Sequence, residues 1–364
     1  MGFNCGIVGL PNVGKSTIFN AITSAKAIVA NYPFTTIEPH SGVVPVPDER
    51  LNVLAKILQP PKIIPTNIEF VDIAGLVKGA NKGEGLGNQF LAHIREVDAV
   101  VHVVRCFEND NVVHTYGSID PKRDVEIVET ELILKDIETI QKNLSELERQ
   151  SKSGDKKVRH AMDVCRKLED HLSTGKLAKM LNLNEEEKAL ACHLHLLTAK
   201  PVMFIANVDE EGLTKGNEYI RVVEELAVHR GSTVLVVDGE IEAELADISY
   251  EEREAFLSDL GIKESGLDKV IHNGYWLLDL ITFFTHNQKE LRAWTVKKGT
   301  KAPQAAGKIH SDFEKGFIKA EVIKIKDLVA VGSESALREK GLLHIQGKEY
   351  QVEDGDVVFF RFNV

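Results

Sequence analysis

The sequence predicts an α/β fold in which helices cover both faces of a mostly parallel sheet, with a helical insertion and a smaller C-terminal β domain. Strand-like runs alternate with helical patterns, as in a doubly wound sheet. The gap between the third and fourth runs is far longer than one crossover helix needs, and it contains helical patterns. The runs are Phe3–Val8, Asn67–Val71, Ala99–Val104, Val202–Ile205 and Thr233–Val237.

Composition is that of an ordinary globular chain: 364 residues, 43% hydrophobic and 27% charged. No apolar run approaches membrane-spanning length, and the first residues lack the charged-then-apolar pattern of a secretory signal. The four cysteines are scattered with no C-x-x-C pair, which argues against a disulfide framework and against a zinc site. We therefore expect a cytoplasmic protein with no membrane partner.

The net charge of −11 argues against a general nucleic-acid coat protein, and we expect no sequence-specific DNA binding. The charge is uneven, because residues 281–364 carry a net charge of +3. This asymmetry hints at a surface that faces RNA or a ribosome.

The run Gly9-Leu10-Pro11-Asn12-Val13-Gly14-Lys15-Ser16 follows the first strand and precedes a helical pattern. It has the G-x-x-x-x-G-K-[ST] pattern of a phosphate-binding loop (P-loop). The glycines allow successive backbone N–H groups to point at phosphate oxygens. Lys15 is expected to reach the terminal phosphates and to offset charge during catalysis, and the Ser16 hydroxyl is placed to bind Mg²⁺. The sequence thus predicts a nucleoside triphosphate site.

Two further motifs indicate a nucleotide switch. Asp72-Ile73-Ala74-Gly75 ends the second strand, where Asp72 would hold Mg²⁺ through water and the Gly75 N–H would sense the γ-phosphate. Thr35 and Thr36 lie between the two motifs, where a threonine can complete the Mg²⁺ shell. The alternative is a pair of solvated loop threonines.

The expected base-reading motif is altered. Asn207-Val208-Asp209-Glu210 stands where a GTPase has N-K-x-D. The aspartate of that motif accepts hydrogen bonds from guanine, and each charge-assisted bond is worth about 1.5–3 kcal/mol. Because Glu210 is one methylene longer and Val208 replaces the lysine, guanine loses its main advantage. ATP is then at least as plausible as GTP.

A helical hairpin is predicted inside the nucleotide domain. Ile133, Ile137, Ile140, Leu144 and Leu147 have coiled-coil spacing, and a second apolar stripe follows the breaker at Ser151–Asp155. The first arm is acidic and the second is basic. Charge pairing between the arms is one interpretation, and a basic arm that meets RNA or a partner is the other.

The C-terminal segment changes character. Short strand-like stretches at Phe317–Ile323, Leu342–Ile345 and Asp356–Phe362 are separated by glycine-containing turns. These features predict a small, mostly β domain.

The group that orients the attacking water is not evident. Leu76 stands where Ras-like enzymes have a glutamine, so intrinsic hydrolysis is expected to be slow. His114 lies in the loop after the third strand, whose carboxyl end faces the ligand crevice, and it is our catalytic candidate beside Lys15. A merely solvated loop histidine is the alternative.

Taken together, G-L-P-N-V-G-K-S, N-Y-P-F-T-T, D-I-A-G-L-V-K-G-A, the degenerate N-V-D-E, the insertion and the C-terminal domain resemble the Obg-like ATPase (YchF) subfamily of Obg-type GTPases. The resemblance implies a P-loop G domain over 1–277, with its insertion at about 124–198, and a TGS-type β-grasp domain over 281–364. It also implies ATP preference, Mg²⁺ held by Ser16 and Thr36, a K⁺ role for Asn12, and a link to the ribosome. The expected nucleotide-binding residues are Asn12, Val13, Gly14, Lys15, Ser16, Thr17, Thr35, Thr36, Asp72, Gly75, Asn207, Val208 and Glu210.

The sequence therefore predicts a slow, Mg²⁺-dependent ATPase that works as a switch on the translation machinery. Three alternatives stay open: a GTP-specific switch, a module that holds nucleotide with little turnover, and a small-molecule kinase. The switch motifs argue against the kinase.

Overall fold

A computed structural model describes residues 3–27, 41–73, 85–151, 155–262 and 264–363 of the chain. Within them two units are distinguished, the first formed by Met1–Val43 with Glu69–Val270 and the second by Val44–Ile68 with Ile271–Val364. None of the described helices is both long and apolar enough to cross a membrane.

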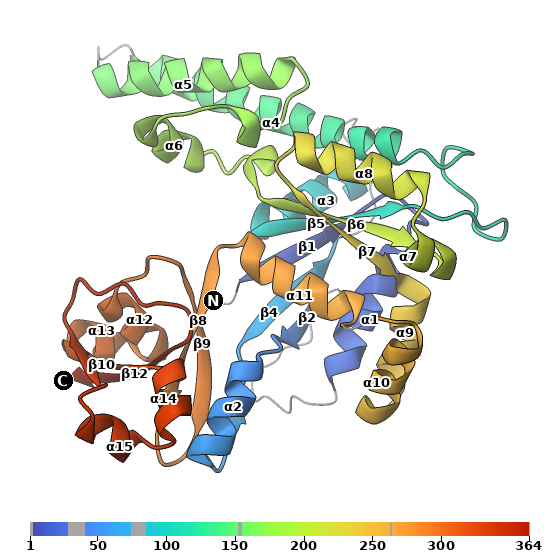
Figure 1. Cartoon of the computed structure of the whole chain (residues 1–364). Helices are drawn as coiled ribbons and strands as arrows, with labels where there is room; N and C mark the ends of the chain where they lie inside the picture. Colours follow the sequence, from blue (N-terminus) through green and yellow to red (C-terminus); the bar gives the residue numbers. More distant parts are fainter. Residues whose placement is uncertain (1–2, 28–40, 74–84, 152–154, 263, 364) are drawn as a thin grey trace. The chain divides into compact units, whose positions relative to one another are not determined.

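The first unit is built on a six-stranded sheet of order β2-β4-β1-β5-β6-β7 (Figure 1). The pairs β1–β4, β1–β5, β5–β6 and β6–β7 are parallel, which confirms the predicted parallel sheet. The order reverses at β1, so the carboxyl end of β1 is the place where such folds bind ligands. The strands are β1 Asn4–Val8, β2 Ser41–Pro45, β4 Asn67–Asp72, β5 Ala99–Arg105, β6 Val202–Val208 and β7 Thr233–Asp238.

Helices cover both faces of this sheet. On one face, alternate residues of β6 pack with Val125 of α4 and Val223 of α8. On the other, α1 packs against α9. The helices are α1 Lys15–Ala27, α3 Gly85–Glu96, α4 Pro121–Ser151, α5 Lys156–Ser173, α6 Glu185–Cys192, α7 Glu210–Lys215, α8 Glu218–His229, α9 Gly239–Asp247, α10 Tyr250–Asp259 and α11 Gly266–Leu277.

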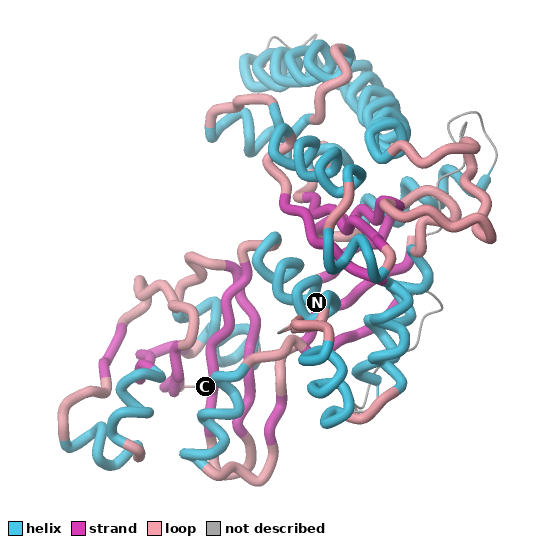
Figure 2. The backbone as a smooth tube through the Cα atoms, turned by 45° about the vertical axis from the view of Figure 1, so that its right-hand side comes forward, coloured by secondary structure: helices cyan, strands magenta, loops and turns pink. Residues whose placement is uncertain are grey.

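The predicted hairpin is present as α4 and α5, which lie side by side in both views (Figure 1, Figure 2). Ile133, Ile140 and Leu144 are buried in its core, and Ile137 and Leu147 pack against it, which confirms the predicted seam. The arms are hardly linked by charge: Arg166 Nη2 lies 3.9 Å from Glu148 Oε1, and both side chains are more than half exposed.

The acidic groups of α4 instead contact other parts of the first unit. Asp136 is fully buried and accepts hydrogen bonds from the N–H groups of Leu197 and Thr198 at 2.7 and 2.8 Å. Glu129 accepts from Arg230 at the end of α8. Charge pairing between the arms is therefore not what holds the hairpin together; its apolar core does.

The second unit holds a mixed six-stranded sheet of order β11-β10-β12-β8-β9-β3. Its first long strand, β8, pairs antiparallel with β9 and parallel with the last strand, β12. Its strands are β3 Ile63–Ile64, β8 Leu280–His286, β9 Leu291–Lys297, β10 Phe317–Lys324, β11 His344–Gln346 and β12 Asp356–Phe362, and its helices are α2 Glu49–Leu58, α12 Ala302–Ile309, α13 Ser311–Lys315, α14 Ile325–Val331 and α15 Glu334–Glu339.

Residues 44–68 differ from the predicted division of the chain, which assigned them to the nucleotide domain. They pack in the second unit because α2 buries Leu51 and Leu54 with Phe284 and Leu291. The second unit is also more helical than predicted, since its helices are too short to give a clear apolar period. Its description as a TGS-type β-grasp domain stays a prediction.

Candidate nucleotide-binding site

The P-loop connects β1 to α1 as predicted. Asn12 and Gly14 adopt left-handed backbone conformations, with φ values of 63° and 88°. A side chain at Gly14 would also collide with the amide of Asn207, so glycine is required there on two grounds. Helix α1 starts at Lys15, which places its unpaired N–H groups and the positive end of its dipole at the pocket.

At this end Lys15 forms an ion pair with Asp72, the last residue of β4. The two side chains are only 10% and 13% exposed. The structure thus brings together the predicted phosphate-binding lysine and the predicted Mg²⁺-linked aspartate. Ser16 and Thr17 are exposed beside them.

The pocket end at Lys15 and Asp72 is called the phosphate end below. The opposite end, called the base end because it holds Asn207–Glu210, is formed where β6 and β7 finish. The Asn207 side chain joins two segments: its Nδ2 donates to Val13 O at 2.9 Å, and its Oδ1 accepts from Gly239 N at 3.1 Å. Asp209 caps α7 by accepting from Gly212 N at 2.8 Å. Asp238 caps α9 through the N–H groups of its first turn, and burial raises the pKa of this carboxyl above its usual value.

The loop after β5 supplies a third wall. Phe107, Glu108, Asn109 and Val112 line the pocket from this loop. The Glu108 carboxylate accepts a hydrogen bond from the Tyr219 hydroxyl at 2.7 Å, and this bond is the main cause that raises the pKa of Tyr219.

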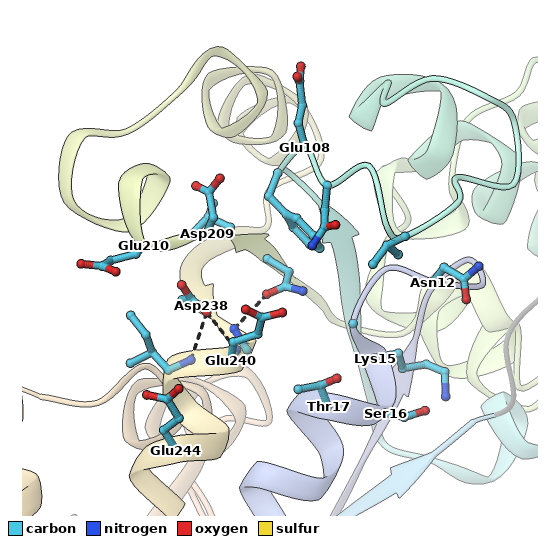
Figure 3. Close-up of a pocket in the computed structure, with 18 of the residues that line it drawn as sticks. Asn12, Lys15, Ser16, Thr17, Glu108, Asp209, Glu210, Asp238, Glu240 and Glu244 are labelled. Atoms are coloured by element: carbon cyan, nitrogen blue, oxygen red, sulfur yellow. Dashed lines mark hydrogen bonds between the residues drawn. The ribbon is translucent and has the colours of Figure 1, made fainter.

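Together these segments enclose a pocket of about 1310 Å³, large enough for a nucleotide. Figure 3 shows Asn12, Lys15, Ser16 and Thr17 on one side of it and the carboxylates of the base end on the other. Those carboxylates belong to Asp209, Glu210, Asp238, Glu240 and Glu244.

Most of the predicted site residues meet in this pocket. Its lining includes Asn12, Gly14, Lys15, Ser16, Thr17, Asp72, Asn207, Val208 and Glu210. Val13 is buried and contributes its carbonyl to Asn207. Thr35, Thr36, Gly75 and Leu76 lie outside the described residues.

His114 does not line the pocket in this conformation. The residue is 9% exposed, its Nε2 lies 2.9 Å from Asp124 Oδ2, and its Nδ1 accepts a hydrogen bond from Tyr116 N at 3.1 Å. Both ring nitrogens are therefore engaged, and the ring donates its Nε2 proton to Asp124. The catalytic role of His114 stays a prediction.

Sequence reasoning missed two walls of the pocket. One is contributed by Phe107–Val112, and the other by Phe256 of α10 and by Leu260, the residue that follows this helix. The position of Phe107 three residues after the end of the predicted strand Ala99–Val104 could have indicated the first wall, since carboxyl ends of parallel strands meet at one edge. No sequence signal marks Phe256 and Leu260, because they reach the site only through the packing of α10.

Comparison with known proteins agrees with this geometry. The family profile described as 50S ribosome-binding GTPase matches residues 4–144, and the YchF-GTPase_C profile, described as a protein of unknown function, matches residues 280–363. The chain is 51% identical over 364 residues to the ribosome-binding ATPase YchF of Escherichia coli O157:H7, with both chains fully covered. It is 50% identical over 366 residues to that of Bacillus subtilis (strain 168), again with both fully covered.

Among solved structures, the Schizosaccharomyces pombe YchF GTPase matches with a TM-score of 0.90 at 38% identity, covering 99% of this chain and 98% of that one. Identity over the full length, together with the agreement of folds, shows that this chain belongs to the YchF family.

Proposed function

We propose that the protein is a Mg²⁺-dependent ATPase that acts as a nucleotide-controlled switch and binds the ribosome. One observation carries this proposal: a nucleotide-sized pocket has a complete P-loop at one end and the altered base motif at Asn207–Glu210 at the other. The relatives in Escherichia coli and Bacillus subtilis that are named ribosome-binding ATPases support it.

In this proposal the P-loop N–H groups and Lys15 hold the phosphates. Lys15 exchanges its contact with Asp72 for the terminal phosphates when the nucleotide enters. Ser16 and Asp72 offer hydroxyl and carboxylate oxygens, which are the ligands that Mg²⁺ prefers, so they fit that ion, with Thr36 as the further expected ligand. When bound, the ion neutralises charge on the phosphates. Water attacks the γ-phosphorus in line, and the bond to the leaving ADP oxygen breaks.

ATP preference follows from the base end. Glu210 begins α7 and cannot place its carboxylate where the shorter aspartate of a GTPase would lie. Asp209 is engaged by Gly212 N and does not replace it. A GTP-specific switch is the alternative, in which other groups recover guanine recognition.

In this proposal His114 orients the water that attacks the γ-phosphorus. Because both of its ring nitrogens are engaged, by Tyr116 and Asp124, this role requires the turn from His114 to Asp124 to rearrange. A protein in which it never rearranges would hold nucleotide with little turnover. The K⁺ role of Asn12 would use its side-chain oxygen, because Nδ2 donates to Val113 O at 3.1 Å. Ribosome binding also implies a cytoplasmic location, and RNA is the proposed contact.

The test is equilibrium titration with fluorescent ATP and GTP analogues in Mg²⁺ and K⁺, followed by single-turnover hydrolysis with and without ribosomes. Tighter ATP binding with ribosome-stimulated turnover is expected. Tighter GTP binding would make the protein a conventional GTPase switch. Nucleotide binding without turnover under either condition would contradict the ATPase assignment.

A further inference from the structure

Arg105, the last residue of β5, is only 2% exposed although it is charged. Its guanidinium donates to three backbone carbonyls of the loop that follows: Nε to Phe107 O at 3.1 Å, Nη1 to Val112 O at 2.8 Å and Nη2 to Asn109 O at 3.2 Å. Its Cζ atom also lies 4.7 Å from the centre of the Phe107 ring. The loop is therefore wrapped around one buried side chain.

This wrapping fixes residues that form the pocket wall. Phe107, Asn109 and Val112, whose carbonyls the guanidinium holds, all line the nucleotide pocket. The loop begins from a fixed point, because Cys106 N donates to Asn207 O and Cys106 O accepts from Asn217, both at 2.8 Å. Among the described residues, the N–H groups within 107–112 make two bonds inside the loop: Val112 N donates to Asn109 O at 3.1 Å, and Asn111 N donates to Asn109 Oδ1 at 2.9 Å. These bonds close one turn at Asn109, and Glu108 accepts from Tyr219, whereas the carbonyls of Phe107 and Val112 are held by the guanidinium.

The far end of the loop is held from the opposite side. Asn12 of the P-loop donates to Val113 O at 3.1 Å, and Arg105 donates to the preceding carbonyl, Val112 O. The loop is thus suspended between the core of the sheet and the P-loop, and His114 follows directly.

We propose that Arg105 is a positioning residue for nucleotide binding: its planar guanidinium is the internal template that holds the loop 106–113 as a wall of the pocket. The role rests on the proposed nucleotide binding and adds to it a residue that never touches the nucleotide. Lysine cannot substitute, because one ammonium group on a flexible stem cannot bond three diverging carbonyls and stack on Phe107 at once.

The first test is Arg105→Lys, which keeps the charge and most of the stem. Its matched control is Arg230→Lys, because Arg230 is another poorly exposed arginine of the first unit that holds Glu129 and a carbonyl outside the pocket. For Arg105→Lys we expect the dissociation constant of a fluorescent ATP analogue to rise about tenfold. For the control we expect no such change. Far-UV circular dichroism and thermal unfolding establish that both variants are folded at the assay temperature.

Hydrogen exchange gives a second readout, which does not depend on ATP binding. In ligand-free wild-type protein the Val112 amide should be protected, and Arg105→Lys should speed exchange across 106–113 while leaving β5 unchanged. An unprotected Val112 amide in the wild type, or ATP affinity within about twofold of wild type in folded Arg105→Lys, would overturn the inference. If the wild type binds no ATP, the proposed function itself fails, which is a different outcome.

Discussion

At the phosphate end of the pocket most ligand-facing groups come from one continuous loop and the start of one helix, with Asp72 added from β4. The base end is assembled from the ends of β6 and β7 and the loop after β5. The two ends also differ in charge. Lys15 lies at the phosphate end, and carboxylates such as Glu210, Glu240 and Glu244 line the base end.

The two ends also differ in how far their polar groups are already hydrogen-bonded within the protein. At the base end Asn207, Asp209 and Asp238 all bond to backbone groups of their own unit. At the phosphate end the backbone N–H groups at the start of α1 are what faces the pocket. Phosphate recognition can therefore be predicted from a contiguous motif, whereas base selectivity depends on which polar atoms the fold leaves available.

The largest effect is expected at the phosphate end. Lys15→Ala removes the cation that offsets charge on the transferred phosphoryl group, so the rate of ATP hydrolysis should fall by a factor of about 100 to 1000. Phosphate release at saturating ATP and Mg²⁺ measures it. Lys215→Ala is the control, since this exposed lysine pairs with Glu211 outside the nucleotide pocket. Equal activity in both variants would mean that Lys15 does not act on the phosphates.

The role of the base end in nucleotide selectivity is tested by restoring the GTPase motif N-K-x-D. Val208→Lys with Glu210→Asp should shift the ratio of GTP to ATP affinity toward GTP by about tenfold or more, because each recovered charge-assisted bond contributes about 1.5–3 kcal/mol. Paired titrations with the two nucleotides measure the ratio. Glu211→Asp, on the exposed side of α7, is the matched control. Two unchanged affinities would show that this loop does not read the base.

Glu242 of α9, the helix that begins at the base end, is expected to make the stability of the protein depend on pH. It is 4% exposed, its Oε1 accepts from Gly266 N at 2.5 Å, and its Oε2 has no hydrogen-bond partner in the described structure. Burial raises the pKa of Glu242 to about 6. The folded protein thus holds this proton more tightly than the unfolded chain, and stability falls as pH rises from about 4.3 through about 6.

Glu242→Gln removes this charge, so at about pH 8 the variant should be more stable by up to about 2 kcal/mol. The gain should vanish at about pH 4.5, where wild-type Glu242 is protonated. Urea unfolding at both pH values gives the difference, and the exposed Glu225→Gln serves as control. A gain that is the same at both pH values would rule out burial of the charge as its cause.

The smallest effect concerns Asp209. Asp209→Ala should cost about 1 kcal/mol of stability through loss of the α7 cap, while Asp209→Asn should keep most of it. Neither should alter the ATP-to-GTP affinity ratio, because this carboxylate already accepts from Gly212 N. A changed ratio in Asp209→Asn would instead show that the side chain contacts the base.

The contrast between contiguous motifs and contacts made by folding also explains how much of the fold and of the site could be predicted from the sequence. The P-loop, the five parallel strands and the hairpin seam follow from local motifs and apolar periods, and the structure confirms them. The packing of residues 44–68 in the second unit could not be predicted, because it depends on Leu51 and Leu54 meeting Phe284, which lies far along the chain. Arg105 was missed for a related reason: its three partners are carbonyls, which carry no residue-type signal.

Helix α4 has a mechanical consequence. It runs unbroken over 31 residues, about 46 Å, and the buried Asp136 bonds fasten it near its middle. About 18 Å separate that fastening from Asp124, the partner of His114, and about 22 Å separate it from the end at Ser151. Val125 and Glu129 also fasten the half of α4 that follows Asp124, so any movement of the turn that holds His114 starts against an anchored stretch of this helix.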